Sequence, residues 1–533
     1  MKMQFIKSNW VDIFIFFIWF CILLWLSPDL SFYLSDSSHG LQIAAGKMIL
    51  LGYIPFKDIL FGYGPLVAYT SAFGELFSNS LIGETLICSL GYAASLYLIY
   101  FLVSRQSSKT LGLFASIIGF LLLARFYKWY YWLFPLLALF CIYQLLKSKE
   151  IDSHETINKR WLYISGFLCG VGGLYRLDLG AALFILFTAL IIILSYQTSS
   201  FLPEVLSRIT PYLVSFIIPF FIWGIFLQVN GGSFIDYLSI TYDGAIGNVQ
   251  YWSFPVPSLD FTNLFSIQSS IAIAFRLVPI SLIIGIIYSY WRNKNSDSIN
   301  SKYFFLMFAS ILGLFLYPQA IHMAEIQHLL QVIPPVIIVV SILLFDLWRY
   351  TISIKDFSKK FVFSFIILIY LIVILLSGLG ISQSGGIGGT DLVKFNLNPI
   401  PKLVQIYEGT KSIDKFPVTD LISTVQNNTA SLEPILIIPP QHQLYFFINR
   451  PMSGMIIWYG PGMYDQEKWR KLNFEKISDN PPKLVIIKDN FSDEFTNYYF
   501  YEYQPELYNY IISNYNSTLY QKQGWVILKR NGE

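Results

Sequence analysis

Charged residues are scarce in this chain, since aspartate, glutamate, lysine and arginine together make up only 13% of its 533 residues. Hydrophobic residues make up 55% and aromatic residues 18%. One soluble core cannot bury so many apolar side chains, which excludes an ordinary soluble enzyme. The composition therefore predicts an integral membrane protein.

Cysteine is also rare, and several familiar motifs are missing. The four cysteines, Cys21, Cys88, Cys141 and Cys169, all lie within apolar runs, so none is a plausible disulfide partner in an outer domain. The sequence lacks a Walker-type glycine loop, a Cys/His metal spacing and an internal repeat of fixed period. The net charge of +3 comes mostly from the expected inner loops and gives no reason to expect a nucleic acid partner.

About eleven apolar runs approach the roughly 17 to 25 residues that a membrane-spanning helix needs. They cover residues 11–26, 82–103, 111–124, 129–146, 161–174, 179–196, 211–227, 271–291, 304–316, 329–347 and 361–378. The first run follows two lysines, as a signal peptide would, but no small-x-small cleavage site follows it. We therefore expect a mainly α fold, a polytopic bundle of about 11 spans that keeps its first helix.

Lysine and arginine accumulate in cytoplasmic loops, and this bias orients the bundle. Lys2 and Lys7 place the N-terminus in the cytoplasm, and every later loop assigned to that side also carries lysine or arginine. An odd number of spans then places the loop of residues 27–80, the loop of residues 231–270 and the C-terminal segment outside. The expected location is a bacterial plasma (inner) membrane.

The composition changes after residue 378, where a glycine-rich linker covers residues 380–389. We expect a membrane-embedded domain over residues 1–380 and an extracytoplasmic soluble domain over residues 381–533. In the soluble domain, strand-like runs alternate with helix-like stretches, which indicates a small α/β domain. The expected strands are 435–438, 484–487 and 525–528, and the expected helices are 419–427, 465–477 and 506–515.

The loop of residues 27–80 carries Asp36, His39, Lys57 and Asp58. Carboxylates beside a membrane, in a chain with so few charges, favour chemistry over solubility. We therefore place the active site in this loop, with Asp36 and Asp58 as catalytic candidates and His39 and Lys57 as substrate-binding candidates.

Structural alternatives exist for these residues. Asp36 could cap a short helix that begins near Ser37. Asp58 could close the turn after Pro55. Lys57 could be an interfacial lysine whose ammonium group reaches the headgroup region.

Further ionisable residues fall at the outer ends of later spans. They are Arg125, Lys128, Arg176, Asp178, His322, Glu325 and His328. Ionisable groups at membrane depth are expensive and usually face a bundle interior or a cavity, so their convergence on one side indicates a site. Arginine forks suit a phosphodiester, so Arg176 is the first candidate for phosphate binding, with Arg125, Lys128 and His328 after it. We expect Asp178, His322 and Glu325 to contact substrate.

Two structural alternatives apply here as well. Arg176 and Asp178 could form a local ion pair that holds two helices together. The three-residue spacing of His322, Glu325 and His328 also suggests a metal site, against contact with a lipid phosphate or ordinary interfacial hydrogen bonding.

The first loop resembles that of the GT-C superfamily of membrane glycosyltransferases. The resemblance lies in Ala-Ala-Gly-Lys-Met-Ile-Leu-Leu-Gly-Tyr-Ile-Pro-Phe-Lys-Asp (44–58) and Gly-Tyr-Gly-Pro-Leu (62–66), and in Tyr-Phe-Phe-Ile-Asn-Arg-Pro (445–451) of the C-terminal domain. The branch it resembles is related to protein O-mannosyltransferases and to the aminoarabinose transferase of lipid A. The similarity in organisation extends over nearly the whole chain.

This resemblance implies a sugar donor carried on a polyprenyl phosphate and a lipid, glycan or protein acceptor on the outer face. Asp36 matches the acid that is proposed as general base for the acceptor hydroxyl, and Asp58 matches a second loop acid that would orient a substrate. Many relatives have Asp-Glu where this chain has Asp36-Ser37, which leaves the role of Asp36 and any divalent cation open.

The residues are chemically suited to this reaction without the resemblance. Glycosyl transfer passes through an oxocarbenium-like centre and needs a carboxylate for the incoming hydroxyl and cations for the departing phosphate. A secondary transporter is disfavoured, because the ionisable residues lie at span ends and an outer domain of this size is unusual for that class. A polymerase or ligase of lipid-linked glycans shares the donor and stays an alternative.

Overall fold

The computed structural model describes residues 2–28, 37–76, 81–151, 158–196, 201–263, 266–294, 300–356, 358, 418–438, 441–488 and 499–532. Two compact units divide the chain. The helical unit comprises residues 1–27, 88–220 and 254–396, and the mixed unit comprises residues 28–87, 221–253 and 397–533. Each unit therefore gathers segments that are distant in sequence.

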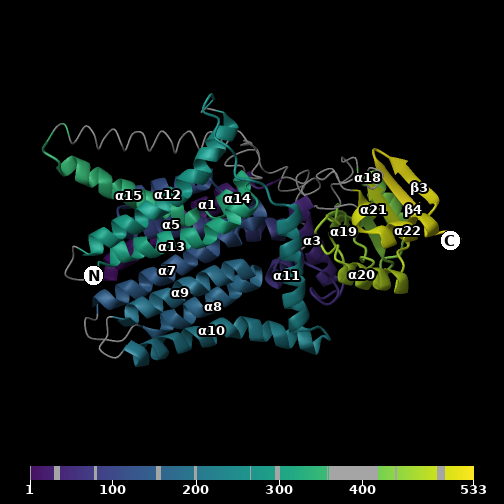
Figure 1. Ribbon diagram of the computed structural model, residues 1–533, viewed down its shortest axis with the longest axis horizontal. Helices are drawn as coiled ribbons and strands as arrows, with labels where there is room; N and C mark the ends of the chain where they lie inside the picture. Colours follow the sequence, from purple (N-terminus) through teal and green to yellow (C-terminus); the bar gives the residue numbers. More distant parts are fainter. Residues whose placement is uncertain are drawn as a thin grey trace. The chain divides into compact units, whose positions relative to one another are not determined.

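Long apolar helices build the helical unit (Figure 1). They are α1 (Lys2–Leu26), most of α5 (Ile82–Gln106), α6 (Lys109–Leu121), α7 (Tyr130–Ile151), α8 (Lys159–Tyr175), α9 (Leu177–Tyr196), the first part of α10 (Phe201–Val229), α12 (Ile267–Lys294), α13 (Ser301–His322) and α15 (Pro334–Ser353), with the short η1 (Phe126–Lys128) and α14 (Ile326–Gln331). The first ten predicted apolar runs all coincide with helices. The eleventh, residues 361–378, lies outside the described residues.

Seven helices of the described chain are long and apolar enough to cross a membrane. Two further apolar helices, Trp10–Leu26 and Lys109–Leu121, are shorter. Large apolar side chains such as Ile217 and Ile287 remain 55% and 62% exposed, as expected of a lipid-facing surface. The prediction of a polytopic helical membrane protein is confirmed, whereas the span count stays a prediction.

Close packing of glycines fixes the turn between α8 and α9. A Cβ atom on Gly180 would lie 2.4 Å from the Cα atom of Gly173, so a larger side chain would push the two helices apart. Helices α7, α9 and α13 pack against one another next to this turn. The turn carries Arg176, whose position is therefore set by rigid elements.

The mixed unit contains a four-stranded sheet in the order β1-β2-β4-β3. Strand β1 (Ile435–Ile438) pairs in parallel with β2 (Leu484–Lys488), and β4 (Trp525–Lys529) pairs antiparallel with β2 and with β3 (Ser517–Lys522). Around the sheet lie α18 (Thr419–Asn428), α19 (Leu444–Ile448), α20 (Glu467–Asp479), α21 (Phe500–Tyr503) and α22 (Pro505–Asn514) (Figure 1). The predicted α/β character and the three predicted strands are confirmed.

The first loop and α11 (Phe234–Tyr251) belong to the same unit as this sheet. Leu60 donates its backbone N–H to the Met455 carbonyl at 2.8 Å, and the Tyr53 hydroxyl donates to the Met452 carbonyl at 2.7 Å. From α11, the Asp243 carboxylate accepts a hydrogen bond from Trp469 Nε1 at 2.9 Å. The loop is thus built onto the C-terminal domain by backbone and side-chain hydrogen bonds.

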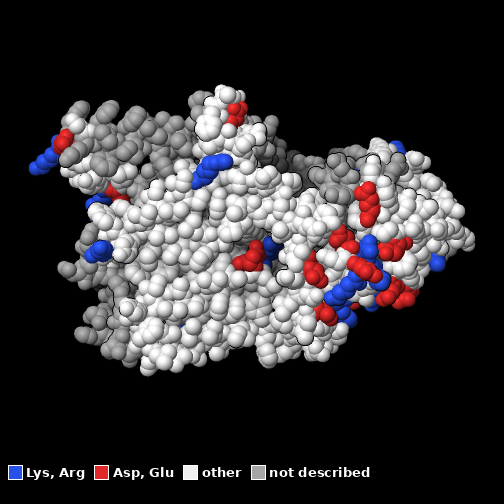
Figure 2. Space-filling view, viewed as in Figure 1, with Lys and Arg blue, Asp and Glu red and all other residues white. Residues whose placement is uncertain are grey.

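Surface charge differs between the two units. On the face shown in Figure 2, the described surface of the helical unit is almost uncharged, while acidic and basic side chains crowd the α/β domain. This difference agrees with a lipid-facing bundle and a water-facing domain. The domain boundary predicted near residue 380 falls among residues outside the described ranges and stays a prediction.

Candidate functional site: a cationic cluster and a buried loop network

Basic side chains gather at one end of the helical unit. Arg125 and Lys128 lie at η1, Arg176 lies between α8 and α9, and His328 lies on α14. The turns that carry them are short and begin or end long helices. We call Arg125, Lys128, Arg176, His322, His328 and the two acids Asp178 and Glu325 the cationic cluster.

Arg125 is held by groups from the α13–α14 connection. Its Nε donates to the side-chain oxygen of Gln327, its Nη1 lies 3.2 Å from the Tyr127 hydroxyl, and its Nη2 lies 3.7 Å from Glu325 Oε2. Gln327 was not among the predicted residues, because a glutamine in a short helix carries no distinctive sequence signal. The Arg125 guanidinium is therefore fixed in direction by these contacts.

Lys128 is only 4% exposed and is surrounded by aromatic rings. Its Nζ lies 5.0 Å from the ring centre of Tyr127, 6.0 Å from that of Tyr130 and 5.8 Å from that of Tyr131. Aromatic faces attract an ammonium group without neutralising it. Lys128 therefore contributes positive charge to the cluster from a largely dehydrated position.

Arg176 forms the ion pair with Asp178 that was weighed as a structural alternative. Its Nε lies 3.0 Å from Asp178 Oδ1 and its Nη2 lies 3.2 Å from Oδ2, a fork geometry. The guanidinium carbon also lies 5.8 Å from the ring centre of Tyr131, which both Lys128 and Arg176 therefore face. Since the Arg176 side chain is 28% exposed, the ion pair does not shut it away from a ligand.

His328 is a largely buried histidine among the charged side chains of the cluster. Burial, together with the positive charges of Arg125, Lys128 and Arg176 and the neighbouring His322, lowers the pKa of His328 to about 3. Its Nδ1 lies 3.7 Å from Glu325 Oε2, and it has no hydrogen-bond partner within the described part of the chain. A neutral histidine among permanent cations indicates a site prepared for an anion.

The same field disfavours the metal interpretation of His322, Glu325 and His328. A divalent cation would have to approach against Arg125, Lys128 and Arg176, and the one carboxylate of the three already lies 3.7 Å from both Arg125 and His328. Phosphate, with its negative oxygens, fits these residues better.

In the mixed unit, Asp58 closes the tight turn that follows the first-loop helix α3 (Ser37–Leu50). Its Oδ2 accepts the backbone N–H of Ile54 at 3.0 Å, and Phe56 between them has a φ of 68°, in the left-handed region. Burial and the charge of Asp58 both raise the pKa of Tyr53. The turn alternative for Asp58 is therefore observed, and the half-buried Asp58 and Lys57 still reach the surface.

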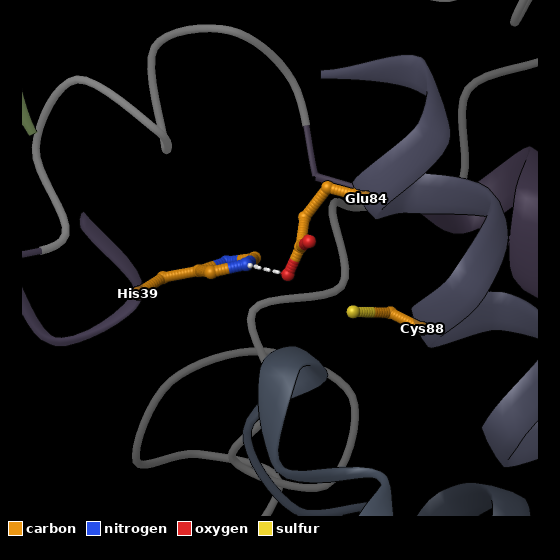
Figure 3. Close-up of side chains that lie close together, drawn as sticks. All are labelled: His39, Glu84 and Cys88. Carbon is orange, nitrogen blue, oxygen red and sulfur yellow. Dashed lines mark hydrogen bonds and ion pairs between the residues drawn. The ribbon is translucent and has the colours of Figure 1, made fainter. Parts of the chain in front are cut away.

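His39 lies in a buried network rather than at the surface. Its Nε2 forms a 3.0 Å hydrogen bond with Glu84 Oε1 (Figure 3). Ser71 Oγ donates a second hydrogen bond to Glu84, to Oε2 at 2.9 Å. These residues come from α3, α4 (Pro65–Leu76) and the start of α5, and each is at most 3% exposed. Cys88 lies one turn after Glu84 on α5.

A second buried pair extends this network. Glu75 on α4 is 1% exposed and Lys47 on α3 is 6% exposed. Burial raises the pKa of Glu75 well above its ordinary range and lowers the pKa of Lys47, although each charge opposes the shift of the other. We call His39, Lys47, Ser71, Glu75 and Glu84 the loop network; only His39 of these was predicted from sequence.

Asp36 lies outside the described residues, so its place and its catalytic role stay predictions. The other predicted residues fall into two groups. His39, Lys57 and Asp58 belong to the mixed unit, while Arg125, Lys128, Arg176, Asp178, His322, Glu325 and His328 belong to the helical unit. Ion pairs and ring contacts link the members of the second group except His322, which interacts electrostatically with Arg176 and Asp178.

The described residues form a multi-pass helical bundle with a cluster of basic side chains at the ends of its helices. No family model matches the chain, and no curated protein matches it in sequence. Among solved structures, ArnT from Cupriavidus metallidurans bound to undecaprenyl phosphate is similar over 98% of both chains, with 11% identity and a TM-score of 0.50. The archaeal oligosaccharyltransferase AglB from Archaeoglobus fulgidus, in complex with an inhibitory peptide and a dolichol-phosphate, is similar over 91% of this chain and 70% of its own, with 12% identity and a TM-score of 0.47.

The chain therefore has the fold of ArnT over nearly its full length. The predicted fold, a polytopic helical bundle followed by a small C-terminal α/β domain, is confirmed by this similarity.

Proposed function

We propose that this protein is a glycosyltransferase that moves a sugar from a polyprenyl-phosphate-linked donor to a lipid, glycan or protein acceptor on the outer face of a bacterial plasma membrane. The observation that carries the proposal is the cationic cluster, in which burial and the neighbouring positive charges together lower the pKa of His328. The fold shared with ArnT, which was solved with undecaprenyl phosphate bound, supports a lipid phosphate as the anion.

The chemistry assigns the cluster to the leaving group. When the acceptor oxygen bonds to the anomeric carbon of the sugar, the bond from that carbon to the phosphate oxygen breaks and negative charge grows on the phosphate. Arg176 and Arg125 would hold the phosphate oxygens through N–H donors, and Lys128 would add a dehydrated positive charge. His328 would contact the same phosphate.

The remaining roles follow the first-loop prediction. Asp36 would accept the proton of the acceptor hydroxyl, and Asp58 would orient a substrate from its fixed turn. Lys57, Asp178, His322 and Glu325 are assigned to substrate contacts, directly or through the groups they hold, whereas the buried His39 would act only by holding the first loop in place. The sugar would be a hexose or a pentose, the N-terminus cytoplasmic and the C-terminal domain extracytoplasmic.

Purified protein in proteoliposomes tests the proposal. Transfer to an acceptor lipid fraction should occur with a polyprenyl-phosphate-linked sugar and not with soluble nucleotide sugars, because the basic site recognises a phosphate that arrives laterally in the bilayer. Comparing the surface lipids and glycans of cells with and without the protein by mass spectrometry would identify the product. Activity with a nucleotide sugar alone would refute the lipid donor.

A further inference from the structure

The phosphate that departs as the leaving group changes its charge during the proposed reaction. The donor phosphodiester carries one negative charge. After the anomeric C–O bond breaks, the electron pair stays on the phosphate oxygen and the acceptor proton goes to the base, so a phosphomonoester remains. Its second ionisation has a pKa of about 6, so it carries between one and two negative charges near neutral pH.

The two arginines of the cluster, Arg125 and Arg176, keep a constant charge through this change, because arginine is always protonated. A histidine, by contrast, changes charge in this range when its surroundings change. His328 is the histidine on which the field of the cluster acts most directly.

Charged and titratable groups face His328 from every neighbouring element. Arg125 and Lys128 come from η1, Arg176 from the α8–α9 turn, His322 from the end of α13, and Glu325 from the residue before α14. Glu325 Oε2 lies 3.7 Å from His328 Nδ1 and equally 3.7 Å from Arg125 Nη2. His328 and Arg125 therefore share one carboxylate oxygen. The negative charge of this carboxylate alone does not keep the His328 ring protonated.

An anion placed among the same cations would reverse this balance. Each negative charge near the ring favours the imidazolium, and among the described residues the buried Nδ1 atom makes no hydrogen bond that would have to break. A singly charged diester would compensate part of the field, and a doubly charged monoester would compensate more of it. The ring therefore gains a proton most readily when the product phosphate is present.

We propose that His328 distinguishes the product from the donor, remaining neutral beside the phosphodiester and taking up a proton from solvent when the phosphomonoester occupies the cationic cluster. This inference rests on the proposed function, because it assumes that the cluster holds the lipid phosphate. Protonated His328 then adds a donor to the monoester, and the proton must leave again before the next donor binds. His328 is thereby assigned to product recognition and release.

Calorimetry on the full-length protein in detergent micelles tests the proposal. A short-chain polyprenyl phosphate and its methyl diester are titrated at pH 7 in two buffers with different ionisation enthalpies, which gives the protons taken up on binding. With the wild type we expect roughly half a proton or more to be taken up with the monoester, and clearly less with the diester. His328→Gln should still bind both ligands but lose this uptake, so that the monoester-to-diester affinity ratio falls about 10-fold.

His322→Gln is the matched control, since it removes a histidine from the same cluster. It should retain most of the proton uptake, whereas loss of uptake in His322→Gln but not in His328→Gln would overturn the assignment to His328. Equal uptake in wild type and His328→Gln would also overturn it, and ligand binding by the variant would show that it is folded. If the wild type binds neither ligand, the proposed function itself fails.

Discussion

The cationic cluster and the loop network are both built from ionisable side chains, but they differ in how their charges are compensated. In the loop network, Glu84 accepts hydrogen bonds from two directions, and Glu75 and Lys47 are both shifted toward their neutral forms. In the cluster, Arg125 pairs with Glu325, Arg176 pairs with Asp178, and Lys128 lies among aromatic rings. Charges that are neutralised within the protein indicate a structural role. Where positive side chains outnumber negative ones, as in the cluster, a negatively charged ligand is expected.

If the cluster binds the donor phosphate, another residue must act as the general base. Removing that base should have the largest effect on the rate of transfer. Asp36→Asn should lower the rate of transfer by about 10² to 10⁴, because it removes a general base. The apparent KM for the donor should change little. Rates are measured with purified protein, and the elution profile and thermal unfolding of the variant serve as controls for folding. Wild-type turnover in Asp36→Asn would refute the role of the loop.

The loop network should respond to mutation in stability rather than in donor binding. Glu84→Gln keeps the shape of the side chain but weakens its bonds to His39 and Ser71 inside a buried site, which should cost about 1 to 3 kcal/mol. Thermal unfolding in detergent measures this loss. The apparent KM for the donor should be unaffected in the folded fraction, and a large rise in KM at unchanged stability would remove the distinction between the two regions.

The pH dependence of stability in Glu75 variants also tests whether the loop network is structural. The pKa of Glu75 is raised in the folded protein. At a pH above the pKa of Glu75 in the unfolded chain, the folded state therefore binds more protons than the unfolded state. Stability falls as the pH rises through the folded pKa. Glu75→Gln removes this titration. We therefore expect the variant to be more stable than the wild type at pH 8, with the difference shrinking as the pH falls toward 4.5. A pH-independent difference would contradict a raised pKa.

Lys128 should give the smallest effect in the cluster. Lys128→Met keeps the stem among the rings of Tyr127, Tyr130 and Tyr131 but removes the charge. Because the lysine acts as a point charge rather than as a fork, we expect the apparent KM for the donor to rise about 3- to 10-fold. Lys128→Arg should restore part of the affinity, and an unchanged KM in Lys128→Met would limit donor binding to the arginines.

Local patterns allowed much of the fold to be predicted. Apolar runs and strand-like runs are properties of consecutive residues, so ten helices and the strands β1, β2 and β4 could be placed from the sequence. Strand β3 was missed because its residues are mostly exposed at a sheet edge and show no apolar run. The α8–α9 ion pair was readable because Arg176 and Asp178 are two positions apart.

Long-range partners could not be predicted in the same way. Glu84 lies 45 positions from His39, and Gln327 lies 202 positions from Arg125, so only the packing of helices reveals these contacts. The contacts between the first loop and the C-terminal domain are also long-range contacts that the sequence does not reveal. They include hydrogen bonds such as Leu60 to Met455, to which no local pattern points.

Donor kinetics of Arg176 variants test the central claim most directly. If the Arg176 fork grips the donor phosphate, Arg176→Ala should raise the apparent KM for the lipid-linked donor, or lower kcat/KM, by roughly 10- to 100-fold, about 1.5 to 3 kcal/mol for a charge-assisted contact. Arg176→Lys should recover only part of this, because lysine keeps the charge and loses the fork. Normal donor kinetics in Arg176→Ala, measured in proteoliposomes, would contradict the account and leave Arg176 as the structural partner of Asp178.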